Sequence, residues 1–266
     1  MISTVALRAG TVTYDVRGTG PPIVMLPSGA HDRSDYDELR RLLPEGVRSI
    51  AMDWPGHGDS PEPTQPGSPT AWADVVEEFV EHVAPEGAVV VGSSIGGFSA
   101  GRLAARRPEL VSGLVCIDAG GFDPPTGSAR AFCALMGRPR FLRAIYPRFS
   151  ARYMQAVSEA DRRARECAIR NTRRSATLPY IAGLWAGFAG PEHDLREAAE
   201  TIAAPTLVVQ GKRDPVIPPA AGRRAAELIR GAGLLEVDSG HSPHTSAPEV
   251  VAEGICHLLA RVPARA

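Results

Sequence analysis

The sequence predicts an α/β fold, in which a mostly parallel central sheet has helices on both faces and a helical insertion. Short apolar runs alternate with segments of helical period near both ends of the chain, and the long stretch between them shows helical spacing only. The 266 residues, 44% hydrophobic and 22% charged, are enough for one large α/β domain with a modest insertion. Alternation of this kind is typical of a parallel sheet.

The expected strands are short, and two of them are apolar at every position. The runs at 23–26 and 88–91 have this composition, which is typical of strands buried on both faces of a parallel sheet. In chain order, strands are expected near residues 4–7, 12–16, 23–26, 47–52, 88–91, 114–117, 206–209 and 234–237.

The clearest helix begins after Ser68 and Pro69. Its apolar residues form one stripe, made of Trp72, Val75, Val76, Phe79, Val80 and Val83. Other helices are expected through 34–43, 103–107, 220–228 and 250–259. The Ser34 to Asp37 spacing resembles an N-terminal cap, and the run 246–249 has capping-box spacing with proline in the first turn.

A long segment separates the two alternating parts of the chain. Residues 122–201 contain no convincing strand, and their apolar residues recur at helical spacing among many arginines. We therefore expect one core made of residues 1–121 and 202–266, with residues 122–201 as a helical insertion between two late strands.

Charge and cysteine content narrow the classes of partner. The net charge is −1, which provides no field of one sign for nucleic acid or an anionic membrane. The four cysteines are scattered and have no metal-ligand spacing, so we expect reduced thiols and no metal. The sequence has neither a signal-peptide pattern nor an apolar run long enough to span a membrane, so we expect a cytoplasmic protein. We also expect it to act on a small molecule and to be a monomer or homodimer.

One motif carries a nucleophile. Gly92-Ser93-Ser94-Ile95-Gly96 matches G-x-S-x-G and stands directly after a buried strand and before a helix. Ser94 is expected at the tip of a strained turn, where side chains at Gly92 and Gly96 would collide. The helix that follows directs its N-terminal amides toward a developing oxyanion. Ser93 is expected to point away from the site.

Around this motif the chain resembles the α/β-hydrolase superfamily over nearly its whole length. The run 53–60, Asp-Trp-Pro-Gly-His-Gly-Asp-Ser, is similar to the family's D-x-P-G-x-G-x-S loop. Gly211-Lys212-Arg213-Asp214 ends a late strand where the family has its acid, and Gly240-His241 follows the last strand where the family has its histidine. The resemblance also implies that the insertion is a cap that roofs the active site.

The resemblance implies a triad of Ser94, Asp214 and His241 in the superfamily's chain order. His241 would take the serine proton, and Asp214 would hold the imidazole in the right tautomer. Asp118, at the end of the strand at 114–117, is the alternative acid, because some members have their acid near that point. His31 and His57 are expected on loops near the mouth of the site.

The oxyanion hole requires two amides. Ile95 N–H is expected to be one, and the loop after Leu26 should supply the other, with Gly29 as the donor by register and Ala30 as the fallback. Many members have His-Gly here, whereas this chain reads Pro27-Ser28-Gly29-Ala30, so a usual anchor of the loop is missing.

The substrate pocket is the least specified part. Candidate pocket residues are Ala30, His31, Tyr146, Trp185 and His244. The insertion has further aromatics that either line the pocket or pack the insertion itself. The insertion also has a cluster of arginines that either bind a substrate carboxylate or form a solvated helix face. They are Arg162, Arg163, Arg165, Arg170, Arg173 and Arg174.

Three functions remain open from the sequence. The first is a cofactor-independent serine hydrolase that cleaves an ester, thioester, lactone or related carbonyl bond of a small apolar substrate through an acyl-enzyme. The second is a lyase, cyclase or perhydrolase that uses the same residues as a base, which the altered loop at 27–30 keeps open. The third is a small-molecule receptor with little turnover.

Overall fold

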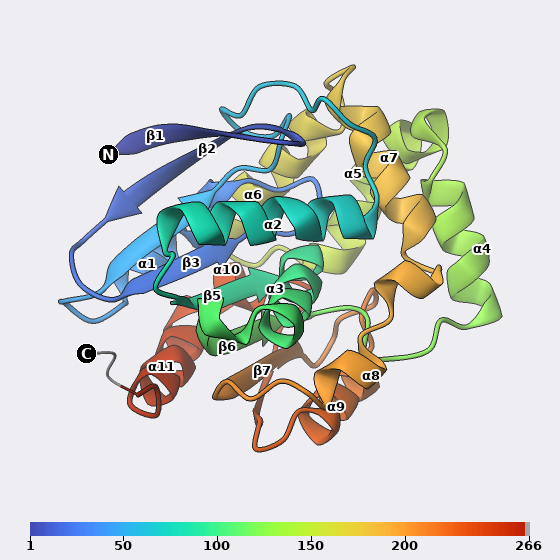
Figure 1. Cartoon of the computed structure of the whole chain (residues 1–266). Helices are drawn as coiled ribbons and strands as arrows, with labels where there is room; N and C mark the ends of the chain where they lie inside the picture. Colours follow the sequence, from blue (N-terminus) through green and yellow to red (C-terminus); the bar gives the residue numbers. More distant parts are fainter. Residues whose placement is uncertain (264–266) are drawn as a thin grey trace.

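The structure, a computed structural model, describes residues 1–263 and contains one eight-stranded sheet (Figure 1). The strand order is β1-β2-β4-β3-β5-β6-β7-β8, in which β1 and β4 pair antiparallel with β2 and all other neighbours are parallel. The strands are β1 (Ile2–Leu7), β2 (Gly10–Arg17), β3 (Pro22–Leu26), β4 (Arg48–Met52), β5 (Ala88–Ser93), β6 (Val111–Ile117), β7 (Thr206–Gly211) and β8 (Gly233–Val237). The predicted fold class is confirmed.

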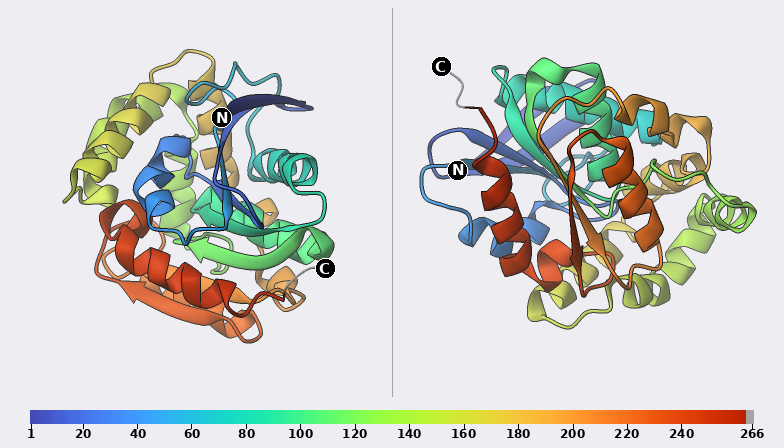
Figure 2. Two further views of the ribbon diagram at one scale, coloured as in Figure 1. Left: turned by 90° about the vertical axis from the view of Figure 1, so that its left-hand side faces the viewer. Right: turned by 90° about the horizontal axis from the view of Figure 1, so that it is seen from below.

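The sheet has a helical layer on each face, as the two views in Figure 2 show. One face is covered by α2 (Pro69–Val83), α3 (Ile95–Arg106) and α9 (Pro219–Leu228), and their apolar residues form one buried cluster with the strands. The other face is covered by α1 (Asp37–Arg41) and α11 (Pro248–Leu259), which form a second cluster. Both faces of the central strands are therefore dry, and every residue of β5 is buried.

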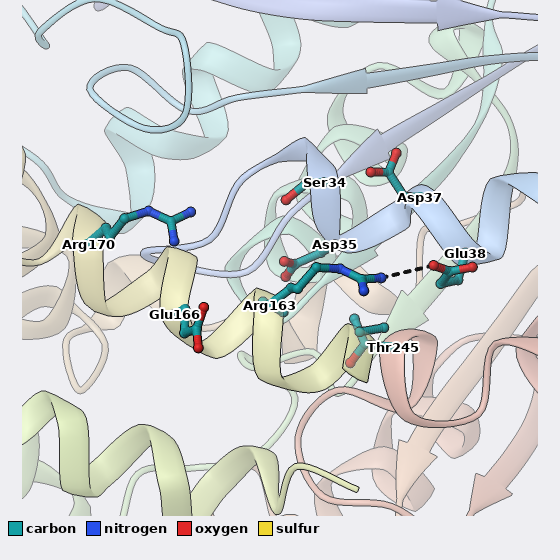
Figure 3. A pocket seen from close by; sticks show the side chains of 10 residues that line it. Ser34, Asp35, Asp37, Glu38, Arg163, Glu166, Arg170 and Thr245 are labelled. Atoms are coloured by element: carbon teal, nitrogen blue, oxygen red, sulfur yellow. Dashed lines mark hydrogen bonds and ion pairs between the residues drawn. The ribbon is translucent and has the colours of Figure 1, made fainter. Parts of the chain in front are cut away.

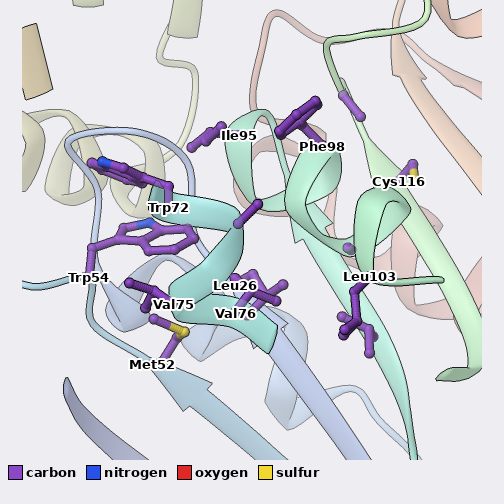
Figure 4. Packing of buried hydrophobic residues seen from close by; sticks show 14 of the residues in the cluster. Leu26, Met52, Trp54, Trp72, Val75, Val76, Ile95, Phe98, Leu103 and Cys116 are labelled. Atoms are coloured by element: carbon purple, nitrogen blue, oxygen red, sulfur yellow. The ribbon is translucent and has the colours of Figure 1, made fainter. Parts of the chain in front are cut away.

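Aromatic packing fixes α2 to the sheet and to the insertion. Ser68 caps α2 by accepting a hydrogen bond from Ala71 N at 3.1 Å, as its position before the apolar stripe predicts. Trp72 on α2 packs against Trp54 with ring centroids 4.5 Å apart (Figure 4). Trp72 also stacks on Tyr180, with ring centroids 4.9 Å apart. The same indole therefore joins the core and the insertion.

Two expected helix caps are wrong. Asp32, rather than Ser34, caps the 3₁₀ turn η1 (Arg33–Tyr36), because its carboxylate accepts a hydrogen bond from Ser34 N at 3.0 Å. The first residue before α11 is Ala247, which has no capping side chain. The Ser246 hydroxyl donates instead to Asp161 at 2.9 Å, a partner 85 residues away that local spacing could not indicate.

The segment between β6 and β7 is helical. It contains α4 (Gly127–Met136), α5 (Pro139–Met154), α6 (Glu159–Asn171), α7 (Thr177–Gly187), the 3₁₀ turn η3 (Pro191–His193) and α8 (Arg196–Ala199). Among the described residues, no strand interrupts it. In Figure 1, α4, α5 and α7 lie toward the right of the view, and α6 lies nearer its centre. The division of the chain at residues 122 and 201 stays a prediction.

The described helices contain no segment that is both long and apolar enough to cross a bilayer.

The short helix α10 (Pro243–Ser246) contains a buried histidine whose protonated form is unfavourable in the folded protein. His244 was expected in the substrate pocket, but it is fully buried and packs on Tyr36, with ring centroids 5.0 Å apart. Neither ring nitrogen has a hydrogen-bond partner. Burial, with a smaller contribution from the nearby His31, lowers the pKa of His244 to about 3.

This buried ring should make stability depend on pH. Because the pKa of His244 is lower in the folded state than in the unfolded state, the unfolded chain binds more protons between about pH 3 and 6.5, and stability falls as the pH falls. From pH 7 to pH 5, His244 alone should remove about 2 kcal/mol from the free energy of unfolding. Urea titrations at both pH values should show that His244→Leu removes this loss.

The matched control is His82→Leu, since His82 is exposed on α2. This control should lose as much stability as the wild type over the same pH change. If His244→Leu and His82→Leu behave alike, His244 is not neutral in the folded protein.

Candidate active site

Ser94 occupies the turn between β5 and α3. Its backbone angles are φ 54° and ψ −115°, a conformation that side chains other than glycine rarely adopt. The turn is fixed on both sides, because Ser94 N donates to Ile117 O at 2.8 Å and Phe98 N donates to Ser94 O at 2.9 Å. The half-buried side chain lines a cavity, while the fully buried Ser93 lies outside the lining of that cavity.

The glycines of the motif are required by close backbone contacts. A side chain at Gly92 would collide with the carbonyl of Gly96 across the turn. A side chain at Gly96 would collide with the carbonyl of Leu26, on the neighbouring strand β3. The sharp turn therefore brings α3 against the loop that follows β3, which places Ile95 beside Gly29.

His241 and Asp214 form a buried pair in the loops after β8 and β7. His241 Nδ1 lies 2.6 Å from Asp214 Oδ2. The other carboxylate oxygen accepts hydrogen bonds from Val216 N at 2.7 Å and Ile217 N at 3.2 Å. Both oxygens are thus engaged, which fixes the carboxylate and leaves His241 Nε2 as the ring nitrogen available for proton transfer.

The backbone of His241 is attached to the insertion. His241 N donates to Tyr153 O, near the end of α5, at 2.8 Å. The rings of these two residues also meet edge to face, with centroids 5.6 Å apart. The position of the histidine therefore depends on the insertion as well as on the sheet.

Asp118, the alternative acid, lies beside this pair. It follows β6 with a positive φ of 44°, and its Oδ1 accepts a hydrogen bond from Gly211 N at 2.7 Å. One carboxylate oxygen of Asp118, one of Asp214 and one ring nitrogen of His241 all lie within 4.8 Å of one another. Burial and the negative charge of Asp214 raise the pKa of Asp118 well above its usual range. The structure joins His241 to Asp214, whereas Asp118 bonds to the backbone of Gly211.

The loop after β3 has anchors that replace the missing histidine. Tyr36 OH donates to Leu26 O at 2.8 Å, and Trp54 Nε1 donates to Pro27 O at 3.1 Å. Asn171 Nδ2, from α6, donates to Ala30 O at 2.8 Å. Three side chains from distant segments therefore hold the carbonyls of this loop.

A fourth anchor comes from the nucleophile turn itself. The hydroxyls of Ser28 and Ser93 lie 2.8 Å apart. This hydrogen bond connects the two segments that carry Gly29 and Ile95, which both line the cavity with Ser94. Ala30, the fallback donor, has a positive φ of 70° and lies outside the cavity lining.

A cavity of about 610 Å³ contains Ser94 and His241 in its wall. Tyr146 and Trp185 line it, as expected from the sequence. Its remaining aromatic wall comes from Phe132, Phe149, Tyr153 and Phe188 of the insertion. Volume and lining are those of a site for a small, largely apolar molecule.

Sequence reasoning missed part of the cavity wall. Val216 and Ile217 line the cavity, and they follow Asp214 closely in the chain. This closeness to the expected acid could have predicted their position. Arg152 and His193 also line it, and nothing in their local sequence indicated this.

His31 and His57 lie elsewhere than expected. His31 is fully buried, with Nδ1 2.6 Å from Asp35 Oδ2 and Nε2 2.7 Å from Tyr153 OH. His57 is also fully buried, and its Nδ1 lies 3.0 Å from Pro55 O. Both rings are therefore structural, because buried partners hold them outside the cavity lining.

The carboxylate of Asp53 organises the loop at 53–60. Its carboxylate accepts hydrogen bonds from Arg33 N and Asp59 N, both at 2.9 Å. A side chain at Gly58 would collide with this carboxylate. The loop at 53–60 thus folds around Asp53.

The arginines of α6 and of the turn that follows it lie outside the cavity lining. Arg163 forms an ion pair with Glu38 at 3.0 Å, in a polar pocket of about 350 Å³ that Asp35, Glu166 and Arg170 also line (Figure 3). Arg174 donates to the carbonyls of Gly56 and Gly58. None of the six arginines named from the sequence lines the cavity that contains Ser94.

Comparison with known proteins agrees with this geometry. A model of the alpha/beta hydrolase family matches residues 23–254. A pimeloyl-(acyl-carrier protein) methyl ester esterase of Xanthomonas campestris pv. campestris is 31% identical over 258 residues, which cover 94% of this chain and 99% of that protein. Esterase Rv0045c of Mycobacterium tuberculosis is 27% identical, covering 91% and 84%.

Solved structures have the same fold. The enol-lactonase from Burkholderia xenovorans LB400 has a TM-score of 0.83 at 22% identity, covering 97% of this chain and 100% of that one. The esterase EaEST from Exiguobacterium antarcticum has a TM-score of 0.84 at 21% identity, covering 98% and 100%. The family match extends over most of the sheet and the whole insertion, and the chain therefore belongs to the alpha/beta hydrolase family.

Proposed function

We propose that this hydrolase cleaves esters of small, largely apolar acids through an acyl-enzyme formed on Ser94. The observation that carries the proposal is one cavity wall that contains both Ser94, on its strained turn, and His241, which is hydrogen-bonded to Asp214. Ester cleavage agrees with the esterase names of the curated relatives. One of those names includes an acyl-carrier protein, and this describes the substrate of that relative only.

In the first half-reaction, Ser94 Oγ attacks the ester carbonyl while His241 Nε2 takes its proton. Asp214 stabilises the resulting imidazolium through Nδ1–H. The amides of Ile95 and Gly29, on segments joined by the Ser28–Ser93 hydrogen bond, stabilise the oxyanion. The imidazolium then gives its proton to the departing alkoxide, and the acyl group stays on Ser94.

In the second half-reaction, water attacks the acyl-enzyme. His241 takes a proton from the water, the Ile95 and Gly29 amides again stabilise the oxyanion, and the proton returns to Ser94 Oγ as the acid leaves. The four anchors of the loop after β3 support a preformed oxyanion hole. They favour the acyl-enzyme over a mechanism in which the triad acts only as a base.

The first test is covalent labelling. A fluorophosphonate probe should form one adduct on Ser94, located by peptide mass spectrometry, because an activated serine attacks the phosphorus and the oxyanion hole holds the product. Ser94→Ala should abolish labelling. His241→Ala should slow it by about a thousandfold or more, since the serine loses its base.

Ser93→Ala is the matched control, because Ser93 is adjacent but lies outside the cavity lining. It should still be labelled on Ser94, at a reduced rate if the Ser28 hydrogen bond matters. A folded wild-type protein that neither reacts with the probe nor hydrolyses a short p-nitrophenyl ester would overturn the acyl-enzyme proposal.

The second test identifies the acid. Asp214→Asn should lower kcat for a p-nitrophenyl ester by about 10³ to 10⁴, because the amide cannot hold His241 in the required tautomer. Asp118→Asn should lower kcat by less than about tenfold, because His241 is bonded to Asp214 and the new amide oxygen can still accept from Gly211 N.

The two variants are matched in size, because each replaces a buried carboxyl group by the amide of the same shape. Circular dichroism and thermal unfolding should establish that both are folded before the rates are compared. The reverse order of activities would assign the role of the acid to Asp118.

A further inference from the structure

The cavity wall contains a positive charge that nothing nearby neutralises. Its charged lining residues, apart from the histidines, are Asp123 and Arg152. Asp123 is paired with Arg224 at 3.0 Å. Within residues 1–263, Arg152 has no ion pair or hydrogen bond, and its side chain is exposed.

The histidines in the wall do not balance this charge. Burial lowers the pKa of His193 to about 4, so its ring is neutral at pH 7. His241 is held by Asp214. The other lining residues are apolar or neutral. Arg152 therefore gives a mainly apolar cavity one positive edge.

The helices around Arg152 strengthen its field. Residues 127–154, which form α4 and α5, contain no aspartate or glutamate. They contain six arginines, all exposed and without an ion pair in the described part of the chain: Arg130, Arg138, Arg140, Arg143, Arg148 and Arg152. The whole chain has a net charge of −1, so this excess of positive charge is local. Such a field raises the local concentration of anions near the cavity.

Several other arginines of this protein are paired with carboxylates, unlike the six of α4 and α5. Arg107 pairs with three glutamates, and Arg163 on α6 pairs with Glu38 and Glu159. A solvated helix face of mixed charge, as on α6, therefore does not describe α5.

We propose that Arg152 recognises a carboxylate or phosphate on the substrate, so that the preferred ester has an apolar chain and an anionic group. This inference rests on the proposed ester hydrolysis at Ser94. The aromatic wall holds the chain, and the planar guanidinium binds the anion with two parallel N–H donors. Arg152 is thus a specificity-determining residue that takes no part in the acyl transfer.

The test compares two substrates that differ only at the far end of the chain. Monomethyl adipate has a terminal carboxylate where methyl hexanoate has a methyl group. For the wild type, kcat/KM for the anionic ester should exceed that for the neutral ester. Arg152→Gln should reduce this ratio about fivefold, since one partly exposed ion pair is lost. Arg152→Lys should restore part of it, and Arg152→Glu should reduce it further.

Two controls separate a contact at Arg152 from other causes. Arg163→Gln, in which an arginine on another helix loses its partners, should leave the ratio as in the wild type. A triple variant, Arg140→Gln with Arg143→Gln and Arg148→Gln, should affect the ratio less than Arg152→Gln alone. Raising the ionic strength from about 0.02 M to about 0.5 M should reduce the ratio in the wild type more than in Arg152→Gln.

The outcomes distinguish this inference from the proposed function. If neither ester is hydrolysed and Ser94 does not react with the fluorophosphonate, the function itself fails. If both esters are hydrolysed with a ratio that Arg152→Gln does not change, the inference is overturned. It is also overturned if the triple variant reduces the ratio as much as Arg152→Gln, because the field of α5 would then act without a specific contact.

Discussion

The site depends on one constraint, the unfavourable backbone conformation of Ser94. Strain of this kind costs about 1–3 kcal/mol and persists only where the surroundings enforce it. Here the enforcing contacts are local and numerous: β5 is buried along its whole length, Ser94 N is bonded to β6, and α3 begins at the next residue. Without side chains at Gly92 and Gly96, the turn can close against β3. The parallel sheet therefore fixes the nucleophile and positions the loop after β3 beside it.

The same sheet explains why two aspartates lie close together beside His241. Asp118 and Asp214 follow the neighbouring strands β6 and β7, so the parallel arrangement brings their carboxyl groups to one edge. Two ionised carboxylates that close together in a dry site would repel strongly. Asp214 is the better partner for the imidazole, because it accepts two backbone N–H bonds and contacts His241, whereas Asp118 accepts one N–H bond. Chain position alone could not separate them.

The sequence contained most of the fold but little of the pocket. Strands buried on both faces, such as 23–26 and 88–91, have a composition that few other elements share, and the turn at Ser94 combines a motif with the elements that it needs. His31 and His244 were misplaced because each is next to a site residue in the chain yet packs on Asp35 or Tyr36 behind the site. The cap expected at Ser246 failed for the same reason, because its hydroxyl bonds to Asp161 on another helix. Such contacts are decided by tertiary packing.

Tyr153 shows how the insertion and the core can act as one site. Its carbonyl oxygen accepts a hydrogen bond from His241 N, and its hydroxyl is held by His31, which is paired with Asp35 in the core. Arg152 is the preceding residue on α5, so the side chain that meets solvent at the cavity wall and the carbonyl that holds the base share one turn of helix. A displacement of α5 would move both together. The insertion therefore cannot change substrate preference freely, because the helix that lines the pocket also supports the position of His241.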